Sequence, residues 1–243
     1  DSKKWVIFPK LSYASHARME ERNVEIGKDF SQYAWNKVEG SSSEKAIIAS
    51  GISYAYAKEY LKNHEDIRLI KIATAYPFPE DFVRTALEGV KEVICLEELS
   101  PYIEEQVLKL AGRYKLSIKV SGKLDGKVPH SGENSANLSA DILSEFLGIE
   151  KVEQGIELSD APALPVRPPV LCAGCPHRAS FYAVKQAMKG KKSYFCGDIG
   201  CYTLGNAMPL DMVDTCLCMG AGITMAQGFH WIDGEGTCFG FVG

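Results

Sequence analysis

The sequence predicts an α/β protein built from two units, each with a mostly parallel sheet. Short apolar runs of strand type alternate with helical patterns from residue 44 to 148, and the alternation resumes at residue 170. A Pro-rich stretch without periodicity separates the two regions. Because strands that alternate with helices form right-handed crossovers, parallel strands are expected in both units.

In the first unit we expect strands at 45–49, 67–73, 93–96 and 117–120, and helices at 52–63, 80–89, 101–114 and 138–147. Residues 1–43 are polar and are interpreted as a connector with one helix at 14–24. Residues 149–169 are interpreted as a linker, because prolines dominate their second half.

In the second unit we expect helices at 179–188 and 219–228, strands at 193–196 and 237–242, and a Gly-rich turn at 197–200. Parallel sheets bind ligands at loops that follow the carboxyl ends of their strands. The loop after the last strand is expected to lie beyond residue 243.

Composition narrows the class of protein. Of the 243 residues, 46% are hydrophobic and 24% are charged, which is typical of a globular chain. The net charge of -4 and the absence of a basic run argue against binding to nucleic acid or to an anionic membrane. No apolar stretch is long enough for a bilayer, and the start lacks a secretory signal. The chain begins with Asp1 and not with a methionine, so we expect a fragment or a processed chain. Because it lacks an export signal, we expect a cytoplasmic location.

Cysteine is concentrated in the second unit. Seven of the eight cysteines lie between residues 172 and 238. In a reduced compartment this favours metal or cluster ligation, or thiols that line a site. We expect Cys95, Cys196 and Cys238 to be ordinary buried side chains.

The pair Cys172 and Cys175 has C-x-x-C spacing, which brings two sulfurs to one side of a turn. The pair has four interpretations: a redox dithiol, half of a zinc site, half of a cluster site, or an inert pair. Cys201 is a candidate third thiolate, and His177 lies close to the pair in sequence.

Two Gly-rich runs are candidate ligand loops. Residues 197–202 follow a strand, and their glycines permit close approach to a ligand. Residues 214–228 are rich in small residues, and a helix start there offers free amides. Met219 has the size to brace a bound ring. The alternatives are an ordinary turn and a close-packed buried helix with Met219 in the core.

The strings RPPVLCAGCPHRASFY, GDIGCYTLG and DTCLCMGAG resemble the catalytic (alpha) subunits of the indolepyruvate:ferredoxin oxidoreductase family. The strings GISYAYAKEYL, TAYPFPED and ICLEELSPYIEEQV resemble the transketolase-C-like domain of these subunits. The resemblance covers residue 44 to the end. It implies a transketolase-C-like domain at 44–148 and a thiamine-diphosphate-binding domain at 170–243, truncated at its C-terminal end.

The resemblance implies oxidative decarboxylation of an aryl 2-oxoacid with coenzyme A, which yields acyl-CoA, CO2 and reduced ferredoxin. The implied cofactors are thiamine diphosphate, Mg²⁺ and a [4Fe-4S] cluster, and the implied partner is a second (beta) subunit. The activating glutamate, the Mg²⁺ ligands and the ferredoxin-like module are expected outside this chain. The chain alone is therefore expected to be inactive.

The resemblance also assigns site residues. It implies that the cofactor contacts Asp198, Gly200, Cys201, Tyr202, Cys218, Met219, Gly220 and Gly222. It implies that the cluster is held by Cys172, Cys175 and Cys201. The fourth cluster ligand is Cys216, Cys218 or a residue beyond 243.

Three alternatives stay open. The substrate is another 2-oxoacid such as pyruvate or phenylglyoxylate, the chain belongs to a thiamine-dependent decarboxylase without a cluster, or the chain is a non-catalytic zinc-binding interaction module.

Overall fold

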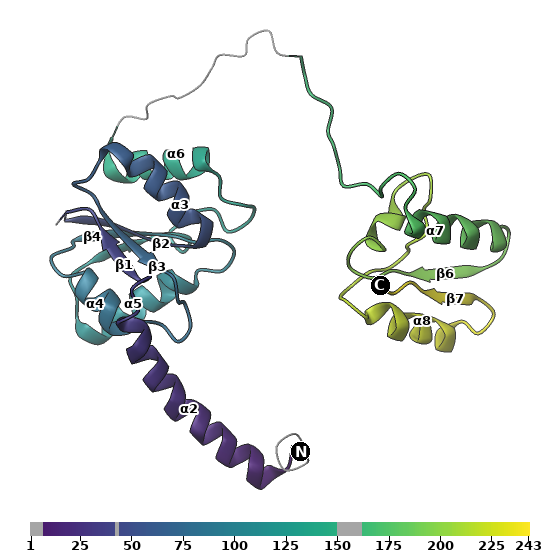
Figure 1. Ribbon diagram of the computed structural model, residues 1–243, viewed down its shortest axis with the longest axis horizontal. Helices are drawn as coiled ribbons and strands as arrows, with labels where there is room; N and C mark the ends of the chain where they lie inside the picture. Colours follow the sequence, from purple (N-terminus) through teal and green to yellow (C-terminus); the bar gives the residue numbers. More distant parts are fainter. Residues whose placement is uncertain (1–6, 42–43, 150–161) are drawn as a thin grey trace. The chain divides into compact units, whose positions relative to one another are not determined.

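The structure is a computed structural model that describes residues 7–41, 44–149 and 162–243 (Figure 1). The chain divides into two compact units, residues 1–156 and 157–243. Each contains parallel strands flanked by helices, so the expected α/β class is confirmed. Among the described residues, no helix combines the length and the apolar character needed to cross a membrane.

The first unit is built on a five-stranded sheet with the order β1–β3–β2–β4–β5. The strands are β1 (Lys37–Glu39), β2 (Lys45–Ser50), β3 (Arg68–Ile72), β4 (Glu92–Leu96) and β5 (Lys119–Ser121). Strands β2 to β5 pair in parallel, whereas β1 pairs antiparallel with β3. Residues 46–49 of the central strand β2 are fully buried. Burial on both faces explains the continuous apolar run of this strand.

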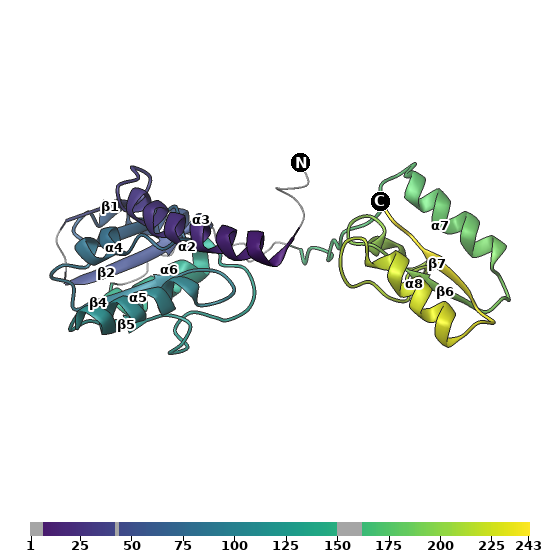
Figure 2. The same ribbon diagram turned by 90° about the horizontal axis from the view of Figure 1, so that it is seen from below.

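Helices cover both faces of this sheet, as Figures 1 and 2 show. The covering helices are α3 (Gly51–Tyr60), α4 (Glu80–Ala86), α5 (Tyr102–Tyr114) and α6 (Ala136–Leu147), with a 3₁₀ turn η1 (Leu61–Asn63). Helix α2 (Pro9–Ser31) precedes the sheet and contacts α4. Helices α3 and α6 share one apolar core that contains Ala57 and Phe146. Helices α4 and α5 share the other, which contains Val83 and Val107.

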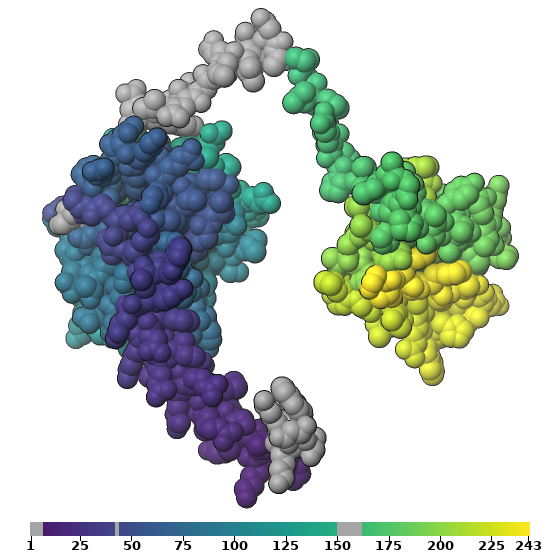
Figure 3. Space-filling view, in the orientation of Figure 1, coloured from purple at the N-terminus to yellow at the C-terminus, as the bar shows by residue number. Residues whose placement is uncertain are grey.

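The region interpreted as a connector contains more structure than the sequence predicts. Helix α2 is longer than the expected helix at 14–24, none of its residues is buried, and Figure 3 shows it projecting from the first unit. Strand β1 joins the sheet, so that sheet begins before residue 44. Three residues are too few to show a strand period, and the pairing with β3 is a long-range contact. Residues 1–6 and 42–43 of the connector lie outside the described residues.

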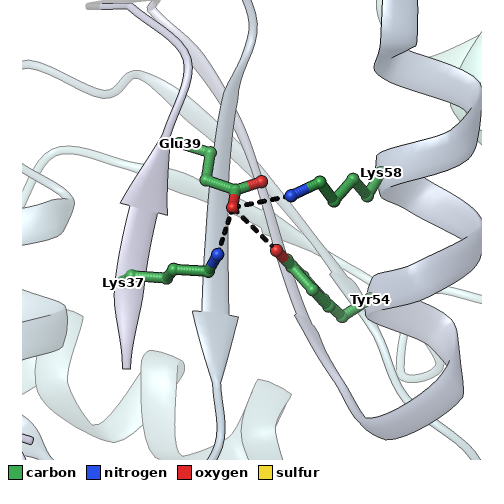
Figure 4. A network of polar contacts seen from close by, with 4 residues as sticks. All are labelled: Lys37, Glu39, Tyr54 and Lys58. Carbon is green, nitrogen blue, oxygen red and sulfur yellow. Dashed lines mark hydrogen bonds and ion pairs between the residues drawn. The ribbon is translucent and has the colours of Figure 1, made fainter. Parts of the chain in front are cut away.

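A polar network joins β1 to α3 (Figure 4). Oε1 of Glu39 accepts hydrogen bonds from the Tyr54 hydroxyl at 2.9 Å and from Nζ of Lys58 at 3.0 Å. Nζ of Lys37 also pairs with this oxygen. Burial by itself would raise the pKa of Glu39, but the three hydrogen bonds outweigh it and lower the pKa to about 2.

Acid is expected to weaken this network. A carboxyl group with a lowered pKa in the folded state stabilises the fold above its ordinary pKa of about 4.3. That contribution is lost as the pH falls from there towards 2. We expect Glu39→Gln to reduce the free energy of unfolding by about 1 kcal/mol at pH 7, allowing for solvent screening. Urea unfolding at pH 7, 5 and 3 measures the difference from the unsubstituted chain, which should shrink in acid.

Glu44→Gln is the matched control, because the ion pair of Glu44 with Lys91 is exposed at both side chains. Its effect should stay within about 0.5 kcal/mol at every pH. A loss in Glu39→Gln that is the same at pH 7 and pH 3 would contradict the lowered pKa.

The second unit has a smaller sheet, in which β6 (Ser193–Cys196) pairs in parallel with β7 (Thr237–Gly240). Helices α7 (Pro176–Ala187) and α8 (Ala221–Ile232) lie on opposite sides of these strands in Figure 1, and η2 (Thr203–Asn206) is a 3₁₀ turn. Phe181 of α7 is fully buried and packs in one core with Val213 and Phe241. This core holds the loops that follow β6 in place.

Helix ends in the second unit differ slightly from expectation. Helix α7 begins at Pro176 and not at residue 179, because proline suits the first helical position. Helix α8 begins two residues after Met219, because Gly220 has the left-handed φ of 82°. Of the expected linker at 149–169, residues 150–161 lie outside the described residues, and residues 162–169 form no helix or strand.

Candidate functional site

Three chain segments of the second unit end at the same edge of its sheet. Besides the ends of β6 and β7, an isolated parallel bridge places Thr215 beside Cys196. Backbone hydrogen bonds hold the three ends together. N of Gly197 donates to O of Thr215 at 2.8 Å, and N of Phe241 donates to O of Cys196 at 2.8 Å. The loops that leave these ends therefore meet where parallel sheets bind ligands.

Asp198 joins the loop after β6 to the start of α8. Its Oδ1 accepts hydrogen bonds from N of Gly220 at 2.8 Å and from N of Ile199 at 2.9 Å. The residue is only 6% exposed. The hydrogen bond from Gly220 lowers the pKa of the Asp198 carboxyl, and burial only partly opposes it. A buried carboxylate thus brings together the two Gly-rich runs that the sequence marks as candidate loops.

Gly222 lets α8 approach the strand ends closely. A Cβ at this position would lie 3.0 Å from O of Gly197, 3.2 Å from O of Cys196 and 3.3 Å from O of Phe241. These neighbours are backbone atoms, which cannot swing aside as a flexible side chain does. Gly222 therefore permits a close contact between α8 and the strand ends.

Met219 and Cys218 occupy the tip of this loop, and both are exposed. The Met219 side chain is 79% exposed. In α8 only Gly222 is buried, so the alternative of a buried helix with Met219 in the core is wrong. An exposed methionine at the start of a helix is free to contact a ligand.

Tyr202 connects the loop after β6 to the start of α7. Its ring meets the His177 ring edge-on, with centroids 4.7 Å apart, and stacks on Phe241 at 5.9 Å. Phe241 carries no signal in the sequence, and His177 is marked there only by its place beside the C-x-x-C pair. No spacing in the sequence signals these contacts, because each joins segments that are distant along the chain.

The cysteine pair adopts the expected turn. N of Cys175 donates to O of Cys172 at 3.3 Å. The Cys175 sulfur lies 3.2 Å from Nδ1 of His177. A hydrogen bond from the Arg178 backbone amide, followed by the His177 contact, lowers the pKa of Cys175. Cys175 is thus the N-cap residue of α7, and its thiol contacts His177 in the first turn of that helix.

The proposed cluster ligands do not form a metal site in the structure. Among the described residues there is no group of three or more Cys, His, Asp or Glu residues placed to hold a metal ion. Cys172 and Cys201 are exposed, and Cys175 is partly buried. Cluster ligation by these three residues stays a prediction. Cys95 and Cys196 are buried as expected, whereas Cys238 is only partly buried.

Comparison with known proteins identifies relatives of this chain, although no family model matches it. The chain is 35% identical over 237 residues to a protein named "Indolepyruvate oxidoreductase subunit IorA" from Methanothermobacter thermautotrophicus. The aligned region covers 94% of this chain and 38% of that protein. Proteins of the same name from Thermococcus kodakarensis and Pyrococcus horikoshii are 36% and 34% identical, over 94% and 93% of this chain and 36% of each relative.

A solved structure titled "Split gene transketolase, inactive beta4 tetramer" matches 45% of this chain and 38% of its own, with a TM-score of 0.35 and 19% identity. The curated matches extend over almost the whole chain, and all carry one name. The chain spans 36–38% of the length of these relatives. It belongs to the family of the IorA subunits of indolepyruvate oxidoreductase and corresponds to a segment of them.

Proposed function

We propose that this chain is part of the catalytic subunit of an indolepyruvate (aryl 2-oxoacid):ferredoxin oxidoreductase. The reaction is the oxidative decarboxylation of an aryl 2-oxoacid with coenzyme A to acyl-CoA and CO2, with the electrons passed to ferredoxin. The observation that carries the proposal is the match to IorA subunits over 94% of the chain. The partner is a second subunit, since IorA names one subunit of an oxidoreductase.

The proposed domain assignment follows the two units. Residues 44–148, extended by β1, form a transketolase-C-like domain, and residues 149–169 form a linker. Residues 170–243 form part of a thiamine-diphosphate-binding domain. The convergence of three strand ends in the second unit supports this assignment, because parallel sheets bind cofactors at such an edge.

The loops at this edge fit thiamine diphosphate as the proposed cofactor, with Mg²⁺ as its ion. Gly200, with φ of 125°, and Gly220 leave the loop backbones uncovered by side chains. The start of α8 offers amides to an anionic group. Thiamine diphosphate, when bound, supplies the electron sink for decarboxylation.

The residues of this chain would position the cofactor. Asp198 orients the amide of Gly220 and keeps the two loops in register. Met219 braces the cofactor rings, and Cys218 lies beside it. Tyr202, held by Phe241, forms a wall of the loop after β6. Cys172, Cys175 and Cys201 would be the ligands of the proposed [4Fe-4S] cluster. In the structure the described residues form no group of three possible metal ligands.

The test is the anaerobic reduction of ferredoxin by the polypeptide that carries this segment, together with its second subunit. We expect reduction to require both coenzyme A and thiamine diphosphate. We expect kcat/KM for indolepyruvate to exceed that for pyruvate and phenylglyoxylate by at least about tenfold, because the larger ring can bury more apolar surface on binding. The 243-residue chain on its own is expected to be inactive.

Two outcomes separate the parts of this proposal. Absence of thiamine-dependent ferredoxin reduction with any 2-oxoacid would refute the function. A preference for pyruvate would reject only the aryl substrate.

A further inference from the structure

An apolar cavity of about 550 Å³ lies against α7 in the second unit. Its walls come from three segments: residues 170–175, the first half of α7, and residues 204–210. Apolar side chains dominate the lining, and Tyr182 and Met208 at its edge are 59% and 79% exposed. The volume falls within the range of about 300–1,000 Å³ that is usual for small-molecule sites.

Two cations tie the walls of this cavity to α7. The guanidinium of Arg178 donates a hydrogen bond to O of Leu171. Nζ of Lys185 donates to O of Pro209 at 2.7 Å and to O of Leu210 at 2.6 Å. Side chains of one helix, α7, therefore hold two walls of the cavity through hydrogen bonds to their backbone carbonyls.

Among the residues that the structure describes, Arg178 is the only basic side chain in the lining, and no acidic side chain lines the cavity. Its one hydrogen bond goes to the Leu171 carbonyl, and it has no carboxylate partner among the described residues. A guanidinium carries five N–H donors, so further donors remain available to an anion. An apolar cavity with one unneutralised cation selects a ligand with an apolar body and one negative charge.

We propose that this cavity binds a carboxylate that carries a flat apolar group, in the class of aryl 2-oxoacids and arylalkanoates. Arg178 pairs with the carboxylate, a geometry that guanidinium groups favour. The ring packs against Tyr182 and the Met208 thioether, both of which interact well with aromatic rings. The inference rests on the proposed function only for the identity of the ligand, which is then the oxidoreductase substrate.

Isothermal titration calorimetry of the 243-residue chain with indole-3-propionate, a carboxylate that cannot be decarboxylated oxidatively, tests the site. We expect saturable binding that is about tenfold or more tighter than binding of uncharged 3-propylindole. Arg178→Gln should lower the affinity for indole-3-propionate by a similar factor and leave the affinity for 3-propylindole unchanged. Circular dichroism melting of this variant checks that the wall at Leu171 remains in place.

A second variant leaves the hydrogen bonds of Arg178 and Lys185 to the cavity walls in place. Met208 is exposed, so Met208→Glu should leave the fold intact while placing a negative charge at the cavity mouth. It should weaken binding of indole-3-propionate several-fold through like-charge repulsion. Met208→Gln, which has the same length without the charge, is the matched control. It loses the thioether contact but adds no repulsion, so it should bind indole-3-propionate several-fold more tightly than Met208→Glu does.

Equal affinities for indole-3-propionate and 3-propylindole, or no saturable binding at millimolar concentration, would overturn the inference. An unchanged affinity in both Arg178→Gln and Met208→Glu would do the same. Failure of the proposed function has another signature, in which ferredoxin reduction is absent although binding still depends on Arg178. If ferredoxin is reduced and Arg178→Gln leaves KM for indolepyruvate unchanged, the function stands and the cavity is not its substrate site.

Discussion

Gly222→Ala is expected to destabilise the second unit by about 1–3 kcal/mol, the usual cost of forcing a methyl group into a filled space. The new Cβ would lie 3.0 Å from O of Gly197 and 3.2 Å from O of Cys196. To relieve these contacts α8 must move away from the strand ends. That movement would also pull Gly220 from Asp198, so we expect the loops of the candidate site to separate.

Gly228→Ala in the same helix is the matched control. A Cβ at residue 228 would meet no atom within 4 Å. Alanine there should stabilise the helix by about 0.5–1 kcal/mol, because it has the higher helix propensity and restricts the unfolded chain. Hydrogen exchange of peptides from the second unit measures both variants without interference from the first unit. Equal protection in the two variants would contradict the close contact at Gly222.

Asp198→Ala is expected to uncouple the loop after β6 from the start of α8. It removes the oxygen that accepts hydrogen bonds from the amides of Gly220 and Ile199, so both amides would lose this partner. We expect the affinity for thiamine diphosphate to fall by about tenfold or more, because the two loops would no longer be held in one arrangement. Asp198→Asn retains one acceptor oxygen and should show a smaller loss.

Thiamine diphosphate binding to the polypeptide that carries this segment, measured by calorimetry, checks this expectation. Glu235→Gln, at an exposed carboxyl of the same unit, is the control and should bind normally. Since the folded pKa of Asp198 is lowered, its contribution to stability should be constant at neutral pH and be lost only as the pH falls below about 4. Normal binding by Asp198→Ala would show that Asp198 does not position the cofactor loops.

Several features of this protein could be predicted from local sequence pattern. The run at residues 45–49 predicts β2 because a strand buried on both faces reads as continuous apolar sequence. The stripe that includes Ile103 and Val107 predicts α5, whose buried side chains follow the helical period. The Gly-rich runs around Asp198 and Met219 mark candidate loops, since glycine there serves backbone conformation and close approach.

Other features depend on contacts that sequence pattern does not show. Strand β1 has three residues, and its place in the sheet depends on pairing with β3. The aromatic contact between Tyr202 and Phe241 joins residues that are 39 positions apart. Tyr202 lies in the loop after β6, and Phe241 lies directly after β7. The cavity at Arg178 depends on a wall that Lys185, about two turns further along α7, attaches through the carbonyls of Pro209 and Leu210.

The sequence by itself therefore determined the α/β class, the parallel strands of both units and the two Gly-rich loops, because burial and backbone freedom leave local patterns. Only the tertiary structure decided that Asp198 bonds to Gly220, that Met219 is exposed and that Cys172, Cys175 and Cys201 form no three-ligand group. The physical reason is that hydrogen bonds and exposure depend on which distant segments meet. The spacing of residues along the chain does not show which distant segments come into contact.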